Sequence, residues 1–173
     1  MQMSGTRTIA ADQATVWAAI LDPEVLKACI PGCQEISGSA DEGFEATVVQ
    51  KVGPVKATFK GAVEVSDRVE PESLTISGEG KGGAAGFAKG GANVTMTAVE
   101  GGTELSYEVE AKVGDKLAQL GSRIIDGFAK KMADQFFEKF QITVEGPEEA
   151  EQTGEDSTDG GEEKKGWFGR LRG

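Results

Sequence analysis

Histidine is absent from this chain of 173 residues. Because histidine is the usual general acid or base near neutral pH, and serine and cysteine nucleophiles usually depend on one, its absence counts against most catalytic mechanisms. Carboxylate and lysine chemistry stay open. The aspartates and glutamates, however, fall mostly on alternating solvent positions of predicted strands or near the C-terminus. We therefore expect a protein that is not an enzyme.

Cysteine is scarce, and the two residues of this type, Cys29 and Cys33, have three residues between them. A redox pair usually has two intervening residues and a helix N-terminus that lowers a thiol pKa. Here the pair flanks Ile-Pro-Gly at the end of a predicted helix. Without histidine, a complete Cys–His ligand set for zinc is also missing. We predict free, packed thiols and no metal site.

Long hydrophobic runs are missing as well. The N-terminal residues lack a basic region followed by an uninterrupted apolar run, so no signal peptide is expected. No stretch approaches the roughly 20 apolar residues that a transmembrane helix needs. The formal net charge of −11 argues against nucleic acid as a partner, because a phosphate backbone is bound by a basic surface. These absences predict a cytoplasmic protein.

Alternating apolar and polar residues dominate the first two thirds of the chain. Asp12 and Asp22 are suitable helix N-caps, so short helices are expected at 12–21 and 22–30. The short turns between consecutive strands favour an antiparallel meander. Period-two patterns predict seven strands, at 2–10, 34–39, 44–52, 55–65, 74–81, 85–99 and 103–113.

The hydrophobic period becomes helical after residue 113, where apolar residues recur every three or four positions. This predicts one helix over 114–140, roughly 40 Å long. Such a helix must bury its apolar side on one face of the sheet. The predicted fold class is therefore α+β in a helix-grip arrangement: an antiparallel curved sheet of about seven strands wrapped around a long C-terminal helix, followed by a disordered tail.

Sheet and helix in this arrangement can part enough to leave a cavity. A glycine inside a helix costs about 1 kcal/mol relative to alanine, so Gly121 indicates either close approach of the sheet or open space. We predict an apolar space with one phenol, suited to a long isoprenoid chain. The expected lining residues are Val63, Leu105, Tyr107, Val109, Leu117, Leu120, Gly121, Ile124, Ile125 and Phe128.

Seven glycines stand between residues 78 and 91. A phosphate-binding loop would need a strand before it and a helix after it, whereas both flanks here are predicted strands. The glycines instead favour a twisted hairpin or a close approach of the backbone to a ligand or partner. Phe87 is the candidate gate of the cavity mouth or a contact for a partner, and a purely structural hairpin is the alternative.

The C-terminal residues reverse their charge. Residues 145–163 contain nine carboxylates and no lysine or arginine, whereas the last ten residues combine four cations with three large apolar residues. That combination is typical of a weak interfacial anchor, and a terminus without a role is the alternative. We predict a ligand-binding domain at 1–142, an acidic disordered linker at 143–163 and a membrane-binding tip at 164–173. The expected membrane contacts are Lys164, Lys165, Trp167, Phe168, Arg170, Leu171 and Arg172.

Four stretches resemble the carbon monoxide dehydrogenase G-subunit family, a branch of the START-like (polyketide cyclase and lipid transport) superfamily. They are DPEVLKACIPGC at 22–33, VGPVKATFKG at 52–61, SGEGKGGAAGFAKGGANV at 77–94 and GDKLAQLGSRIIDGFAKKMADQFFEKF at 114–140. The resemblance covers residues 1 to about 142. It implies a START-like fold and a non-catalytic accessory protein of aerobic CO oxidation, whose molybdenum-containing dehydrogenase carries the cofactors on other subunits.

The same resemblance implies a lipophilic ligand and attachment of the dehydrogenase to the cytoplasmic membrane. We expect no covalently bound cofactor. A respiratory quinone, menaquinone or ubiquinone, is the expected ligand, because the dehydrogenase must pass electrons to a pool dissolved in the bilayer. The expected location is peripheral, on the inner face of the cell membrane. An assembly or maturation factor without a lipid ligand and a small-molecule enzyme of the cyclase type are the alternatives.

Overall fold

The computed structural model describes residues 1–146. The chain divides after Phe140 into two units, Met1–Phe140 and Gln141–Gly173. The sheet and its helices belong to the first unit, except for the last residues of the C-terminal helix. The predicted membrane-binding tip and most of the predicted acidic linker lie outside the described residues.

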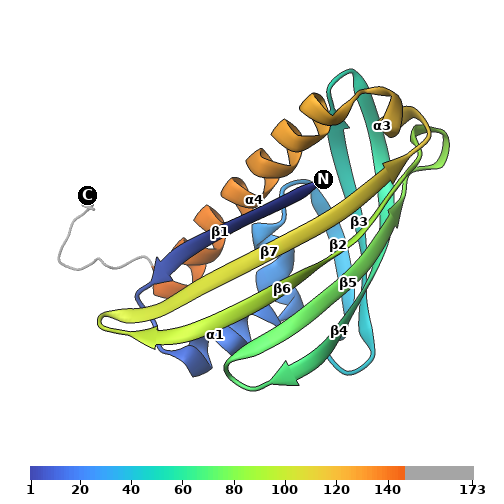
Figure 1. The fold of residues 1–173 in the computed structure, drawn as a ribbon. Helices are drawn as coiled ribbons and strands as arrows, with labels where there is room; N and C mark the ends of the chain where they lie inside the picture. Colours follow the sequence, from blue (N-terminus) through green and yellow to red (C-terminus); the bar gives the residue numbers. More distant parts are fainter. Residues whose placement is uncertain (147–173) are drawn as a thin grey trace, which may run out of the picture. The chain divides into compact units, whose positions relative to one another are not determined.

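One antiparallel sheet of seven strands forms the larger layer of the first unit (Figure 1). The strands are β1 (Gln2–Ile9), β2 (Cys33–Ser39), β3 (Gly43–Val52), β4 (Val55–Val69), β5 (Ser73–Lys81), β6 (Phe87–Val99) and β7 (Gly102–Gly114). Their spatial order is β1-β7-β6-β5-β4-β3-β2, so only the β1–β7 pair joins strands far apart in sequence. This confirms the predicted meander, with β1 and β2 at the edges.

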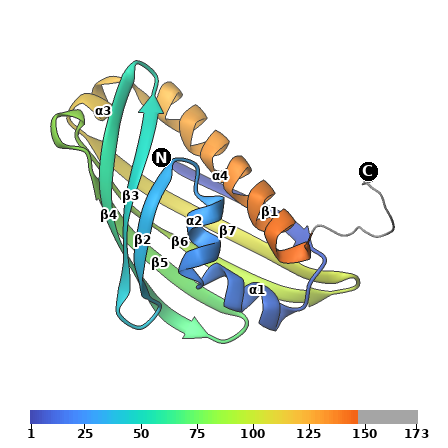
Figure 2. The same cartoon turned by 180° about the vertical axis from the view of Figure 1, so that it is seen from behind.

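The helices lie on one face of this sheet, as Figures 1 and 2 show. Two of them begin at the predicted N-caps: the carboxylate of Asp12 accepts from the Thr15 amide at 2.8 Å, and that of Asp22 from the Glu24 amide at 2.9 Å. Hydrogen bonds from Thr15 lower the pKa of Asp12. The helical elements are α1 (Gln13–Ile20), α2 (Pro23–Cys29), the 3-10 turn η1 (Gly83–Ala85), α3 (Lys116–Gln119) and α4 (Ser122–Glu145).

The single helix predicted over 114–140 is wrong, because the chain breaks at Gly121. This residue lies between α3 and α4 with φ of +89°, in the left-handed region that ends helices and favours glycine. A helical repeat of apolar residues does not reveal such a break, since the repeat continues in phase on both sides. Gly121 is thus a joint between two helices and does not mark space beneath one helix.

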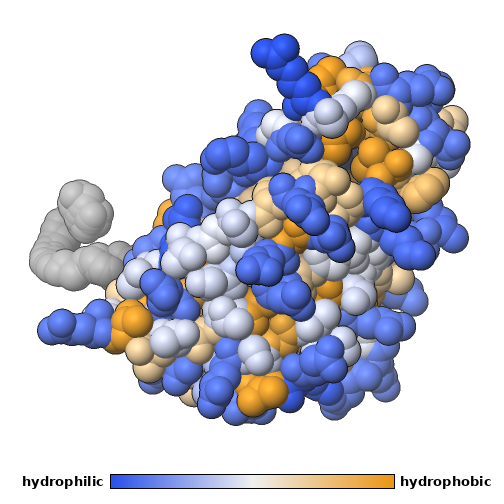
Figure 3. Space-filling view, viewed as in Figure 1, coloured by the Kyte–Doolittle hydropathy of each residue, from blue (hydrophilic) through white to orange (hydrophobic). Residues whose placement is uncertain are grey.

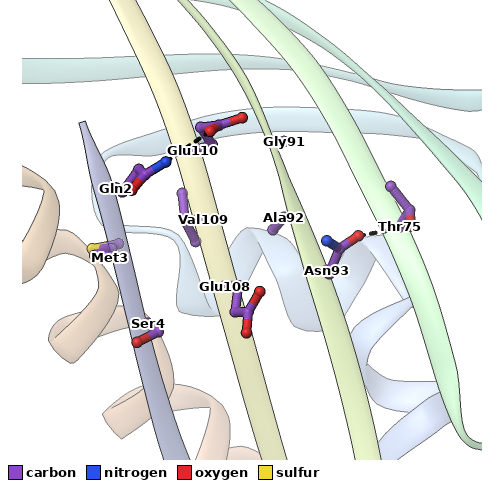
Figure 4. Close-up of a pocket in the computed structure, with 10 residues that line it drawn as sticks. All are labelled: Gln2, Met3, Ser4, Thr75, Gly91, Ala92, Asn93, Glu108, Val109 and Glu110. Carbon is purple, nitrogen blue, oxygen red and sulfur yellow. Dashed lines mark hydrogen bonds between the residues drawn. The ribbon is translucent and has the colours of Figure 1, made fainter.

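The register assigns every second residue of each strand to the face that the helices cover. The opposite, outer face is polar, and Figure 4 looks onto it at β1, β7, β6 and β5. There the Gln2 amide donates to Glu110 at 2.9 Å, and the Thr75 hydroxyl donates to Asn93 at 3.0 Å. This alternation confirms the period-two prediction and leaves the inner face to apolar residues.

The inner face carries two apolar regions. At one end, α1 packs on β6 and β7 and buries Trp17, next to strand residues that include Met96 and Leu105. At the other end, Val52, Leu117 and Ile125 form a second buried cluster beneath α3 and the start of α4. The fold is therefore anchored at both ends of the sheet, and the middle of the inner face lies between these clusters.

Thr103 offers a test of the α1 end. It is fully buried, and its hydroxyl donates to the Ala11 carbonyl at 2.7 Å. Thr103→Val keeps the shape but leaves that carbonyl without its donor, so the free energy of unfolding in urea should fall by about 1–3 kcal/mol. Thr97→Val, at an exposed position of β6, should change it by less than about 0.5 kcal/mol. Equal effects would mean that the Thr103 hydroxyl does not hold the α1 segment.

Candidate functional site

An apolar cavity of about 450 Å³ lies between the sheet and α4. The sheet side is formed by alternate residues of six strands: Met3, Val48, Gln50, Val52, Phe59, Gly80, Ala88, Val109, Ala111 and Val113. The helix side is formed by Leu117, Ile125, Phe128, Ala129, Met132, Ala133 and Phe136. Met1 and the loop residues Ile30 and Pro31 complete the lining.

Small residues on both sides create this space. Gly80, Ala88 and Ala111 face α4 from neighbouring strands, and a Cβ built at Gly80 would come no closer than 4.0 Å to another side chain. On the helix side, the small residues are Ala129 and Ala133, which lie one turn apart on α4. The Cα atoms of α4 lie more than 8 Å from those of the strands at almost all positions. The glycine-rich stretch thus forms a hairpin, as predicted, whose inner side is part of the cavity floor.

Gln50 is the one polar side chain among the lining residues that the structure describes. Its amide nitrogen donates to the carbonyl oxygen of Pro31, which joins β3 to the loop between α2 and β2. Gly32, the next residue, has φ of +76°, and its carbonyl accepts from the Val49 amide at 2.9 Å. These contacts fix the loop on β3 and turn Ile30 and Pro31 toward the cavity.

Four of the predicted lining residues do line this cavity: Val109, Leu117, Ile125 and Phe128. Val63 lies on the inner face of β4, two rows beyond Phe59, but outside the lining. Leu105 is fully buried at the α1 end. Tyr107 stacks on Phe137 with ring centroids 4.7 Å apart and borders a separate pocket with Asp126 and Lys130. The phenol predicted in the cavity is therefore outside it.

The residues predicted around the helix break lie elsewhere too. Ile124 packs beside Gly53 in the β3–β4 turn, with Leu120 close by. A Cβ at Gly121 would meet no heavy atom within 4 Å, and this residue does not border the cavity. Phe87 stands on the outer face, because its neighbour Ala88 faces inward. Phe87 therefore does not gate this cavity.

Several lining residues were not predicted. Met132 and Phe136 belong to the helical repeat of apolar residues, and Ala129 and Ala133 follow Ile125 at intervals of four, so the repeat alone could have found them. Ile30, Pro31 and Gln50 gave no such signal, because they meet the cavity through a loop contact between segments far apart in sequence.

Outside the cavity, the groups of chemical interest in the first unit are two thiols and the carboxylates. Cys29 is buried and Cys33 is half-buried, and neither forms a disulfide. Burial raises the pKa of Cys33, which makes it a weak nucleophile near neutral pH. Within residues 1–146, no group of three or more Cys, Asp or Glu side chains is arranged to hold a metal ion. Nor is any helix in that range long and apolar enough to cross a membrane.

Gln50→Leu tests the loop contact, with Cys33 as its reporter. Loss of the bond to Pro31 should let the loop open more often, so alkylation of Cys33 at pH 8 should accelerate about three- to ten-fold. In both proteins the rate should rise with pH, because the thiolate reacts and burial raises the pKa of this thiol. Gln119→Leu, at an exposed position of α3, is the control. Unchanged labelling of Gln50→Leu would show that the loop is held by other contacts.

Comparison with known proteins gives both a family and a fold. A family model described as the G subunit of carbon monoxide dehydrogenase (CoxG) matches residues 5–145. No curated protein matches the chain. Among solved structures, a conserved protein from Geobacillus kaustophilus aligns with a TM-score of 0.77 and 28% identity, over 83% of this chain and 95% of its own.

More distant structures show the same fold. A START superfamily protein from Mycobacterium smegmatis aligns with a TM-score of 0.62 and 15% identity, over 83% of this chain and 97% of that one. A protein from Chromobacterium violaceum aligns with a TM-score of 0.63 and 16% identity, over 84% and 99%. The predicted START-like class, a seven-stranded antiparallel sheet with a long C-terminal helix, is confirmed.

Proposed function

Since the chain belongs to the CoxG family, the G subunits of carbon monoxide dehydrogenase, we propose that this accessory subunit carries a lipophilic molecule and links the enzyme to the cell membrane. The apolar cavity of about 450 Å³ is the observation that carries the proposal. Its volume is within the usual range of small-molecule sites, about 300–1,000 Å³. A charged ligand is disfavoured, because a buried charge without a partner is costly.

A respiratory quinone suits this lining. Its isoprenoid chain is wholly apolar and matches the strand and helix residues around the cavity. Its ring carries two carbonyl oxygens, which need a polar neighbour or water. Gln50 is the polar residue within the described lining, and most of the lining side chains are half-buried, so the cavity has an opening to solvent. The ring is therefore expected near Gln50 or at that opening, with the chain inside.

The same lining supports a non-catalytic role. No Asp, Glu, Lys, Arg or Tyr is among the described residues that surround the cavity. Proton transfer to or from a ligand needs such a group within hydrogen-bond reach. A protein that holds a lipophilic molecule without changing it fits this arrangement, and the redox chemistry belongs to the dehydrogenase in this proposal.

The predicted tip at 164–173 supports the membrane link, although it lies outside the described residues. Its four cations would each contribute about 1 kcal/mol at an anionic leaflet, and Trp167, Phe168 and Leu171 add apolar contact. The protein would then be peripheral on the inner face of the membrane. A soluble dehydrogenase and a quinone dissolved in the bilayer would meet through this accessory protein.

Ala129→Phe tests the carrier role. Purified full-length protein should yield a near-stoichiometric quinone on organic extraction and mass spectrometry. The phenyl ring at residue 129 would project into the cavity, so the variant should lose at least nine tenths of that ligand, at a cost of about 1–3 kcal/mol in stability. Ala98→Phe, the same change at an exposed position of β6, should retain it. A wild-type protein without any lipophilic ligand would instead favour an assembly or maturation factor.

Deleting residues 164–173 tests the tip. Binding to anionic vesicles should weaken at least 100-fold, while ligand retention stays unchanged. Trp167→Ala should weaken binding at every salt concentration, whereas Arg170→Gln should matter mainly at low salt, because the screening length falls to about 8 Å at physiological ionic strength. Co-sedimentation measures both. Equal sedimentation of intact and truncated protein would remove the tip from the membrane link.

A further inference from the structure

Eight exposed cations gather at the end of the sheet where the β3–β4 turn, η1 and α3 lie together (Figures 1 and 2). Residues 1–146 contain 14 basic and 21 acidic residues, so this concentration runs against the net charge of that part of the chain. We call this set the basic rim. It consists of Lys51, Lys56, Lys60, Lys81, Lys89, Lys112, Lys116 and Arg123.

Six of these lysines stand opposite one another in the strand register: Lys51 with Lys56, Lys60 with Lys81, and Lys89 with Lys112. Like charges directly opposite each other destabilise a sheet. Within residues 1–146, none of the eight cations has a carboxylate oxygen within 4.0 Å, although Glu79 is in register with Lys89. The fold therefore keeps a repulsion that an anionic partner would relieve.

Apolar side chains are exposed among these cations. Phe87 is 36% exposed on the outer face, in register with Lys81 and Gly114. Ile124 is 41% exposed beside the β3–β4 turn. Pro54, in that turn, is exposed as well. Figure 3 shows hydrophobic surface gathered at this end of the sheet, over α3 and the neighbouring turns, with hydrophilic side chains around it.

The rim also adjoins one end of the cavity. Val52, Leu117 and Ile125 line the cavity and form the buried cluster beneath α3, with Leu120 packed against it. Leu120 is followed directly by the joint at Gly121. The side chains that separate the rim from the cavity at this end are therefore apolar.

We propose that the basic rim is a docking surface for an anionic lipid bilayer, which brings the α3 end of the cavity to the membrane. Cations with exposed apolar side chains between them are the pattern of interfacial binding. An acidic protein surface would match the same charges and is the alternative occupant that the tests below separate from a bilayer. The docking rests on the charges and exposure of the rim. The identity of the molecule exchanged at this surface rests on the proposed function.

The first test compares two triple variants of the full-length chain with equal net charge. Lys56→Gln/Lys81→Gln/Lys89→Gln removes rim cations, and Lys27→Gln/Lys131→Gln/Lys139→Gln removes exposed cations elsewhere. Each cation near an anionic leaflet raises affinity about five-fold. Binding to vesicles of phosphatidylcholine with about 30% phosphatidylglycerol should therefore weaken about 100-fold in the rim variant and less than about five-fold in the control. Both variants keep the C-terminal tip, so its contribution is the same.

The second test uses the two ends of one strand. Phe87 begins β6 at the rim, and Val99, 38% exposed, ends β6 at the opposite end of the sheet. In a full-length Trp167→Phe background, the fluorescence of Phe87→Trp should be quenched by brominated lipid in those vesicles. That of Val99→Trp should not, and the native Trp17 is only 5% exposed.

Equal vesicle binding by the two triple variants, or equal quenching at residues 87 and 99, would overturn the docking proposal. Loss of binding to purified CO dehydrogenase by the rim variant, with vesicle binding intact, would assign the rim to a protein interface and overturn it as well. Ligand retention is measured on the same samples by extraction. If vesicle binding depends on the rim but no ligand is extracted, the carrier role is wrong and the docking proposal stands. If ligand is extracted but vesicle binding does not depend on the rim, the docking proposal is wrong and the carrier role stands.

Discussion

The separation between α4 and the sheet is the constraint on which the rest of this structure depends. Glycine and alanine occupy the positions at which sheet and helix face each other, including Gly80, Ala88 and Ala129. The larger side chains of Phe59 and Phe136 lie around them and hold the two layers apart. Most of the lining residues are half-buried, so the space between sheet and helix opens to solvent and water can enter it. Apolar surface left in contact with water forgoes about 25 cal/mol per Å² that burial would contribute. A lipophilic molecule in this space would restore that burial.

Stability and ligand binding are divided along the sheet. The α1 end supplies fully buried packing, with Leu105 and Met96 beneath the helix and Thr103 tied to the loop before it. The α3 end is built from short pieces joined by turns, including the left-handed Gly121. Because the first region carries the packing, the second can tolerate an open cavity and exposed apolar residues. Local opening is cheapest where buried contacts are fewest.

The fold could be predicted because its signals are local. Alternation gave the strands, aspartate caps gave α1 and α2, and cavity residues such as Val109 and Ile125 followed from strand and helix periods. The failures are non-local. Tyr107 shares a face with Val109, but its stacking on Phe137 depends on where α4 crosses β7. The hydrogen bond from Gln50 to Pro31 joins two segments of unrelated sequence, and no periodic pattern in the sequence predicts it.

The basic rim is another feature that strand register reveals and composition does not. The sequence shows an acidic protein, and its net charge alone predicts repulsion from an anionic bilayer. Only the strand register brings Lys60 beside Lys81 and Lys89 beside Lys112, and so gathers cations that are far apart in the chain. An acidic domain with one basic end has a preferred orientation at such a bilayer: the rim is attracted, and the remaining carboxylates are repelled. Repulsion elsewhere thus sharpens the orientation that the lysines favour, and it is this orientation that would set the α3 end of an apolar cavity against the lipid.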